Sequence, residues 1–215
     1  MFTGIVEHLG TVSRLEATSA GGKVTVHAPT LAPHLAVSAS VAVNGCCLTV
    51  VHREGNHFFA DLSVETLAKT SLGSLKTAAR VNLEQPLTAG KEFGGHFVLG
   101  HVDGTGRVAR LKPEGDSWIY GVEVPADLAQ YVVSKGSITI DGISLTVARW
   151  RNRIAEIAVI PYTYEHTNIR DRVTGDAVNL ETDVLGKYIE RYMGQQAADK
   201  ISSSLTIDEL MRQGF

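Results

Sequence analysis

Residues Ser40-Val-Ala-Val-Asn-Gly-Cys-Cys-Leu-Thr-Val50 return 97 positions later as Ser137-Ile-Thr-Ile-Asp-Gly-Ile-Ser-Leu-Thr-Val147. Each copy has a short run rich in β-branched residues, an Asn-Gly or Asp-Gly pair, and a second run. Such a pair between two runs of this kind is typical of a tight turn that joins antiparallel strands. The stretch therefore predicts the same β-hairpin in both halves of the chain.

The similarity extends to both sides of the hairpin. Upstream, Gly4-Ile-Val-Glu-x-x-Gly-x-Val12 returns as Gly100-His-Val-Asp-x-x-Gly-x-Val108, at an offset of 96. Downstream, Val81-Asn-Leu-Glu84 returns as Val178-Asn-Leu-Glu181, at an offset of 97. A register kept over this distance indicates a tandem duplication. We predict a first repeat at residues 1–96, a second repeat at 97–185 and a tail at 186–215.

Each repeat reads mainly as β-structure. Short apolar or alternating runs are separated by Gly, Asn or Pro, which favours a small barrel or sandwich over βαβ units. We predict a mainly all-β fold of two tandem, pseudo-symmetric, Greek-key-like antiparallel β-barrels with short helices. The strands of the first repeat are expected at 11–12, 23–26, 40–43, 47–51, 58–62 and 80–83, and the helices at 29–35, 65–71, 125–133 and 163–169.

The tail has a different pattern. Five apolar residues fall at i, i+3, i+4, i+7 and i+8, the spacing of one helical face: Leu185, Tyr188, Ile189, Tyr192 and Met193. A second short helix is predicted after the capping-box pattern Thr206-x-x-Glu209. These faces either dock on the barrels of the same chain or form a subunit interface.

Composition excludes several classes of protein. The chain has 215 residues, of which 44% are hydrophobic, and 20 basic against 23 acidic residues give a net charge of −3. This composition is that of a folded protein and provides no basic field for nucleic acid. No apolar run reaches the roughly 20 residues of a membrane span, and residues 1–10 lack the pattern of a signal peptide. We therefore expect a cytoplasmic protein with no nucleic-acid or membrane partner.

The two cysteines, Cys46 and Cys47, are adjacent. Neighbouring side chains on a strand point to opposite faces, so the aliphatic alternation of Ile143, Leu145 and Val147 assigns Cys46 to the core by repeat equivalence. Cys47 then shares the polar face and takes the place of Ser144; the alternative is that it is a small buried hydrophobe. A metal site with nearby histidines is not expected, because adjacent cysteines lack the usual ligand spacing.

The second repeat carries ionisable groups where the first does not. His101 replaces Ile5, Asp141 replaces Asn44, and Lys135 precedes the second hairpin. His96 and His101 also flank the start of the second repeat. Such groups serve acid–base chemistry, so the pattern indicates two related pockets with divided roles.

Four segments carry a resemblance to riboflavin synthase of the α-chain type. They are Met1-Phe-Thr-Gly-Ile-Val-Glu7, Val43-Asn-Gly-Cys-Cys-Leu-Thr-Val50, Gly94-Gly-His-Phe-Val-Leu-Gly-His-Val102 and Ile140-Asp-Gly-Ile-Ser-Leu-Thr-Val147. The resemblance covers essentially the whole chain, including a final helix at Ile207–Phe215. It implies a transferase of riboflavin biosynthesis that dismutates two molecules of 6,7-dimethyl-8-ribityllumazine into riboflavin and 5-amino-6-(ribitylamino)pyrimidinedione, without metal or organic cofactor.

The resemblance also implies an assembly. In this family each barrel binds one lumazine, and the working site lies between the first barrel of one subunit and the second barrel of another in a homotrimer. Holding two substrates face to face lowers the barrier through proximity and orientation. A larger assembly with lumazine synthase stays open.

By the same resemblance, ligand contacts of the first barrel fall on Gly4, Ile5, Val6, Cys47, Leu48, Thr49, Asp61, Leu62, Ser63, Val64, Glu65 and Thr66. Those of the second barrel fall on Gly100, His101, Val102, Lys135, Ser144, Leu145, Thr146, Ile160, Pro161, Tyr162, Thr163, Tyr164 and Glu165. The expected chemical participants are Phe2, Ser40 and Cys47 of one subunit and His101, Asp141 and Ser144 of another.

Within that set, His101 is the expected base for the 7-methyl proton, with Ser144 and Asp141 as a polar relay. Cys47 either adds to the ring or positions it. Tyr162 and Tyr164 are bulkier than the family pattern leads us to expect. The alternatives are a non-catalytic lumazine-binding optical protein on the same fold, which would lack polar groups in one half, and a flavin reductase barrel, which would need a nicotinamide domain.

Overall fold

The computed structural model describes residues 1–202 and 211–212. The chain divides into two compact units, Met1–Asp183 and Val184–Phe215, so both repeats belong to one unit. Of the predicted second tail helix, Ile207–Phe215, only residues 211–212 are described, and they are helical; its capping-box residues Thr206 and Glu209 lie outside the described residues. None of the helices in the described part of the chain has the length and apolar character that a membrane span requires.

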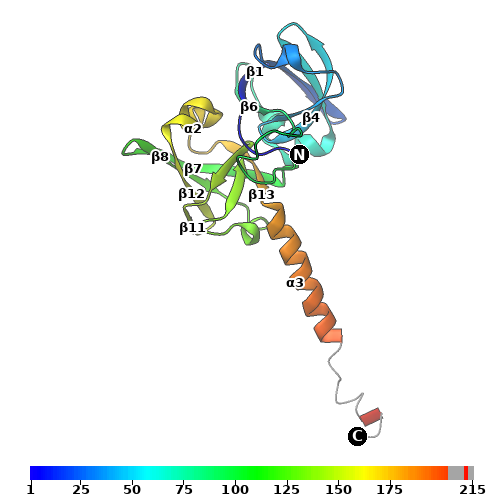
Figure 1. Ribbon diagram of the computed structural model, residues 1–215, viewed down its shortest axis with the longest axis vertical. Coiled ribbons are helices and arrows are strands. Elements are labelled where there is room, and N and C mark those ends of the chain that lie inside the picture. Colours follow the sequence, from blue (N-terminus) through cyan, green and yellow to red (C-terminus); the bar gives the residue numbers. More distant parts are fainter. Residues whose placement is uncertain (203–210, 213–215) are drawn as a thin grey trace. The chain divides into compact units, whose positions relative to one another are not determined.

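The first repeat is a closed barrel, coloured blue to cyan in Figure 1. Its strands follow the order β1-β2-β5-β4-β3-β6, closed by pairing of β1 with β6. All six predicted strands are present: β1 (His8–Thr18), β2 (Gly21–His27), β3 (Ser40–Val43), β4 (Cys46–Glu54), β5 (His57–Leu62) and β6 (Arg80–Glu84). The predicted helices appear as η1 (Ala32–His34), α1 (Val64–Lys69) and η2 (Ser71–Ser74).

The second repeat is a half-barrel rather than a closed barrel. Its seven strands follow the order β10-β9-β13-β7-β8-β12-β11. The strand that matches β4 is divided at Val147 and Ala148, the position where β4 itself shifts register against β5 between Val50 and His52. The elements are β7 (Gly104–Glu114), β8 (Ser117–Glu123), η3 (Ala129–Tyr131), β9 (Ser137–Ile140), β10 (Ile143–Thr146), β11 (Arg149–Arg151), β12 (Ile154–Val159), α2 (Pro161–His166), η4 (Asn168–Asp171) and β13 (Ala177–Thr182).

Each repeat has its own apolar core, as the period-two pattern predicts. Cys46, Leu48 and Val50 are buried in the first core. Ile143, Leu145 and Val147 occupy the equivalent places in the second. Both hairpins turn through two left-handed residues, Asn44-Gly45 and Asp141-Gly142, as type I′ turns require.

The two repeats are joined through these hairpin turns. A Cβ atom on Gly45 would lie 2.6 Å from the backbone nitrogen of Gly142, so only glycine permits the approach. Around the turns, buried amides bond across the junction in matched pairs. The Asn82 Nδ2 donates to the carbonyl of Asp141, and the Asn179 Nδ2 donates to the carbonyl of Asn44, each at 2.8 Å. The repeats therefore meet in a pseudo-twofold arrangement.

The second unit contains the helix α3 (Val184–Ser202), which begins two residues before the predicted tail. Its five stripe residues are all exposed, between 53% and 69% of their surface: Leu185, Tyr188, Ile189, Tyr192 and Met193. The helix predicted from the stripe is thus present.

Candidate functional site

The leading segment of each repeat, residues 2–6 in the first and 98–102 in the second, packs against the other repeat. The backbone nitrogen of Cys47 in the first barrel donates to the carbonyl of Gly100, at 2.8 Å. The nitrogen of Ser144 in the second repeat donates to the carbonyl of Gly4, at 2.7 Å. The two segments meet in an antiparallel bridge between Phe2 and Val98, and the N-terminus lies at this junction in Figure 1.

This crossing corrects the expected grouping of site residues. Gly4, Ile5 and Val6 were expected beside Cys47, yet Val6 packs on the second core. Gly100, His101 and Val102 were expected in the second barrel, yet Val102 packs on the first core. Each candidate binding region therefore has one side formed by the leading segment of the other repeat.

A buried glutamate anchors each crossing segment. The Glu181 carboxylate accepts hydrogen bonds from the backbone nitrogens of Leu99 (2.6 Å) and Gly100 (3.0 Å). The Glu84 carboxylate accepts from those of Thr3 (2.7 Å) and Gly4 (3.0 Å). Burial raises the pKa of Glu84, while the bonds from Thr3 and Gly4 oppose that rise. Neither glutamate was predicted as a site residue, although their repeat match was visible in the sequence.

The first pocket is a cavity of about 280 Å³ around Cys47. Gly100 closes over it with a left-handed φ of +79°, and a Cβ there would lie 2.7 Å from the Cβ of Cys47. The lining includes both a thiol and an imidazole, together with carboxylate, hydroxyl and amine groups from α1. The lining residues are Cys46, Cys47, Glu65, Thr66, Lys69, Thr70, Gly100, His101 and Val102.

The adjacent cysteines differ as the alternation predicts. Cys46 is 6% exposed, and burial raises its pKa to about 12, with smaller contributions from Cys47 and Glu181. Cys47 is half-buried and lines the pocket. Phe2 is fully buried in a small cluster with Ala42 and Val98, packed against Cys47. Phe2 therefore packs against Cys47 from the protein interior and supports that side of the pocket.

The matching region of the second repeat is more polar. The Ser144 Oγ lies 2.7 Å from the Nδ1 of His96, and the His96 Nε2 lies 3.1 Å from the Oγ1 of Thr139. Burial lowers the pKa of His96, against a smaller opposing effect of Asp183. The first repeat has Cys47 and Ala42 in place of Ser144 and Thr139. From the sequence, His96 was expected only to flank the start of the second repeat.

The expected polar relay of His101, Ser144 and Asp141 does not form within one chain, because each of these residues has other partners. Asp141 is buried in an ion pair with Arg172 (2.5 Å) and accepts from the backbone nitrogen of Asn179 (2.8 Å). Ser144 is bonded to His96 instead, and His101 lines the first pocket. Asp141 thus stabilises the junction of the repeats.

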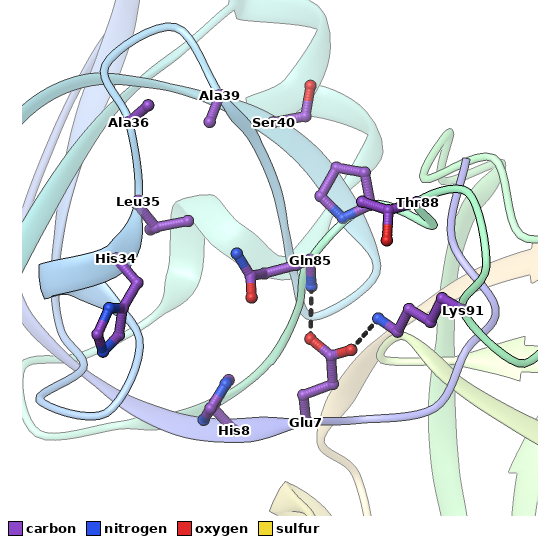
Figure 2. Close-up of a pocket in the computed structure, with 11 residues that line it drawn as sticks. Glu7, His8, His34, Leu35, Ala36, Ala39, Ser40, Gln85, Thr88 and Lys91 are labelled. Carbon is purple, nitrogen blue, oxygen red and sulfur yellow. Dashed lines mark hydrogen bonds and ion pairs between the residues drawn. The ribbon is translucent and has the colours of Figure 1, made fainter.

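Ser40 lies in a different cavity, of about 670 Å³, shown in Figure 2. There the Glu7 carboxylate accepts from the backbone nitrogen of Gln85 (3.0 Å) and pairs with Lys91. Ser40 pairs with Thr49 in the sheet, beside the pairing of Ala42 with Cys47. Ser40 therefore shares the outer face of the sheet with Cys47 but does not line the same cavity.

The remaining expected contacts are distributed unevenly. Leu48, Leu62 and Leu145 are buried in the cores, so only their backbones are available to a ligand. Asp61 is exposed beside Lys23, at 3.7 Å. The others are exposed or half-buried: Ile5, Thr49, Ser63, Val64, Lys135, Thr146, Ile160, Pro161, Tyr162, Thr163, Tyr164 and Glu165.

The helix α2 carries the two unexpected tyrosines. Tyr162 stacks on His166 at 4.1 Å between ring centroids, and Tyr164 stacks on Trp118 at 3.8 Å. Tyr162 remains 69% exposed, so it presents an aromatic face to solvent. Within the described residues, no three His, Cys, Asp or Glu side chains gather as ligands for a metal ion.

Comparison with known proteins gives a consistent result. The lumazine binding domain family matches residues 3–86 and 99–183, one copy per repeat. Riboflavin synthase of Actinobacillus pleuropneumoniae is 42% identical over the whole of both chains. Riboflavin synthase of Mycobacterium tuberculosis is 44% identical over 90% of this chain and 98% of its own. The crystal structure of LumP complexed with riboflavin superposes with a TM-score of 0.80 at 26% identity, covering 85% of this chain and 99% of that one.

Proposed function

Because the chain belongs to the riboflavin synthase family, we propose that it converts two molecules of 6,7-dimethyl-8-ribityllumazine into riboflavin and 5-amino-6-(ribitylamino)pyrimidinedione. One molecule gives a four-carbon unit to the other, which makes the protein a transferase. The reaction draws only on protein side chains and the second substrate molecule.

The observation that carries this proposal is the crossed pair of binding regions. Two copies of one ligand need two related sites, and the pseudo-twofold relation of Cys47–Gly100 and Ser144–Gly4 provides them. LumP has been crystallised with riboflavin and, at 25% identity to this chain, with 6,7-dimethyl-8-(1'-D-ribityl) lumazine. We infer that each region of this chain holds one lumazine.

In the first pocket, strand backbone next to Cys47 and Gly100 offers donors and acceptors to the pyrimidinedione edge. Glu65 and Thr66, at the start of α1, offer a carboxylate and a hydroxyl to the ribityl chain. His101 lines the same pocket, so we assign it as a base for the lumazine held there. Cys47 contacts the ring of that lumazine.

The second region offers Ser144 and the first turn of α2 to the other lumazine. Ile5 and Tyr162 are exposed on this side, at 48% and 69%. We propose that this apolar surface meets the first pocket of another subunit, so that the two lumazines react across a subunit boundary. The exposed stripe on α3 supports a subunit interface, and the homotrimer is the assembly that the family resemblance implies. Association with lumazine synthase stays a possibility raised by the resemblance, and a cytoplasmic location stays a prediction from the sequence composition.

A direct test supplies the lumazine as the sole substrate. The chain should consume two lumazine molecules for each riboflavin molecule formed. The reaction is monitored by the appearance of riboflavin absorbance and fluorescence. A non-catalytic binding protein, the alternative on the same fold, would instead saturate with lumazine and leave its concentration unchanged. That second result would refute the proposed function.

A further inference from the structure

The junction of the two repeats contains a further cavity, of about 260 Å³, which shares no lining residue with the first pocket. One side comes from η2 and the residues after it, and the other from the residues that lead into β13. The lining residues are Ser71, Ser74, Leu75, Lys76, Ala79, Arg172, Asp176 and Ala177. Pockets that enclose drug-sized ligands have volumes of roughly 300–1,000 Å³, so this cavity suits a small ion better than a second lumazine.

The pseudo-twofold relation of the repeats gives this cavity a counterpart, and the counterpart contains an ion pair. At the matched positions, 97 residues apart, Asp171 stands for Ser74 and Arg80 stands for Ala177. The Arg80 guanidinium donates to both carboxylate oxygens of Asp171, at 2.5 Å from its Nε. On the cavity side a serine and an alanine supply neither of these groups. The cavity thus lies where the other half of the junction holds a carboxylate.

Two buried donors at the cavity have no hydrogen-bond partner among the described residues. Ser71 is 5% exposed, and its Oγ is one of these donors. At the matched position, the Asn168 amide donates to Asn44 and Asp141, each at 3.2 Å. The Nε–H of Arg172 is the second donor, although another nitrogen of the same guanidinium pairs with Asp141. A buried donor without an acceptor costs free energy, and an acceptor in the cavity relieves that cost.

The charged groups of the lining favour an anion. Lys76 and Arg172 contribute two positive charges, and Asp176 contributes one negative charge. One carboxylate oxygen of Asp176 accepts from the backbone nitrogen of Val173, at 2.9 Å. Asp141, which does not line the cavity, neutralises part of the charge on Arg172. The remaining excess of cations and of N–H and O–H donors matches an oxyanion, which accepts charge-assisted hydrogen bonds.

We propose that this cavity binds a small oxyanion, either inorganic phosphate or the carboxylate of a small acid. The anion accepts hydrogen bonds from the Ser71 Oγ–H, the Arg172 Nε–H and the Lys76 ammonium. Because these donors come from both repeats, the bound anion links the repeats and stabilises their junction. The inference is independent of the proposed function.

The test is thermal unfolding of the full chain at constant ionic strength, with sodium chloride replaced stepwise by sodium phosphate or by sodium acetate. At least one oxyanion should raise the Tm of the parent along a saturable curve, since a ligand that binds only the folded state stabilises it. K76A should raise the half-saturating concentration by roughly 2- to 5-fold, as loss of an exposed charge does. S71A should not lower the Tm in chloride, because its hydroxyl is unpaired there, but should raise the half-saturating concentration by roughly 2- to 10-fold.

The double variant S74D/A177R installs the ion pair of the counterpart and should abolish the saturable rise. The matched control is K112A, which removes an exposed lysine of β7 outside this cavity and should follow the parent curve. Saturation with phosphate alone identifies a phosphate site, and saturation with acetate alone identifies a carboxylate site.

Two results would overturn the proposal. One is that neither oxyanion gives a saturable rise in the parent. The other is an equal rise in the parent, K76A and S71A, which would show that the anions act only by exclusion from the protein surface. These two single variants decide the question if the double variant does not fold. Failure of the parent to form riboflavin would refute the proposed function and leave this comparison unchanged.

Discussion

The crossed construction predicts that a change in one repeat impairs the site of the other. Glu181 belongs to β13 of the second repeat, but it anchors Leu99 and Gly100, which wall the first pocket. In E181Q one carboxylate oxygen becomes an NH2 group, which cannot accept a hydrogen bond. One of the two backbone nitrogens then loses its partner.

The expected magnitude follows from that lost acceptor. A buried donor left without a partner costs about 1–3 kcal/mol. If the segment relieves this cost by moving away from Cys47, the same free energy is lost from the preorganised pocket. We expect affinity for lumazine at the first pocket to fall by roughly 5- to 150-fold, the factor that corresponds to this range.

Alkylation of Cys47 reports on the first pocket alone. Cys46 is buried and burial raises its pKa to about 12, so iodoacetamide should label Cys47 selectively. Lumazine should protect Cys47, and the protection midpoint should shift in E181Q. The matched control is E84Q, whose carboxylate holds Thr3 and Gly4 at the second region and which should leave that midpoint in place. Equal shifts in both variants, or no shift in E181Q, would refute the crossed assignment.

Three further outcomes are expected from the same structure. C47A should lower riboflavin formation at unchanged thermal stability. C46A should retain activity but lose about 1 kcal/mol of unfolding free energy, measured by urea titration, because the substitution leaves a small cavity. Equal losses of activity in both variants would contradict the assignment of the two cysteines to opposite faces of the strand. Deleting residues 186–215 should give a smaller species by sedimentation that binds lumazine without converting it, and a truncated monomer with parent activity would contradict the intersubunit site. R172A should destabilise the fold by roughly 3–5 kcal/mol, since it leaves the Asp141 charge buried and unpaired; a urea midpoint within error of the parent would show that the pair is not needed.

Much of the fold follows from local sequence. Period-two alternation and the Asn-Gly and Asp-Gly pairs are set by backbone geometry, so the six strands of the first repeat, the core faces and the hairpin turns were predicted, although β1 extends well beyond the predicted residues 11–12. Repeat comparison added the relation between the halves and assigned Cys46 to the core. The helical stripe of the tail followed from its spacing in the same way.

The crossing of the leading segments could not be predicted in this way. Residues 4–6 and 100–102 have nearly the same sequence pattern. Either segment could therefore pack against either repeat with similar local contacts. Which barrel each segment joins is a long-range choice that depends on the junction, including the Phe2–Val98 bridge and the two buried glutamates. Local patterns hold no information on that choice.

The sequence contains a pattern that predicts the ion pair of Asp141. Arg172 lies at the repeat position of Leu75, 97 residues later, just as Asp141 replaces an uncharged residue of the first repeat. The second repeat therefore gains an acidic and a basic residue together. A joint change of this kind indicates an ion pair rather than a catalytic acid. His96 had no such signal, because its counterpart would precede residue 1 and repeat comparison says nothing there.

The duplication and its breaks in symmetry together suit a dismutation. One scaffold repeated twice gives two sites for the same ligand, but identical sites would hold two identical partners with no preferred direction of transfer. Here the proposed sites differ in the atoms that face the ring: a thiol and His101 in one, a hydroxyl linked to a buried histidine in the other. The crossed segments add a constraint, since each site is completed only when both repeats are folded. Different acid–base groups on a shared frame would therefore assign donor and acceptor roles to two molecules of one substrate.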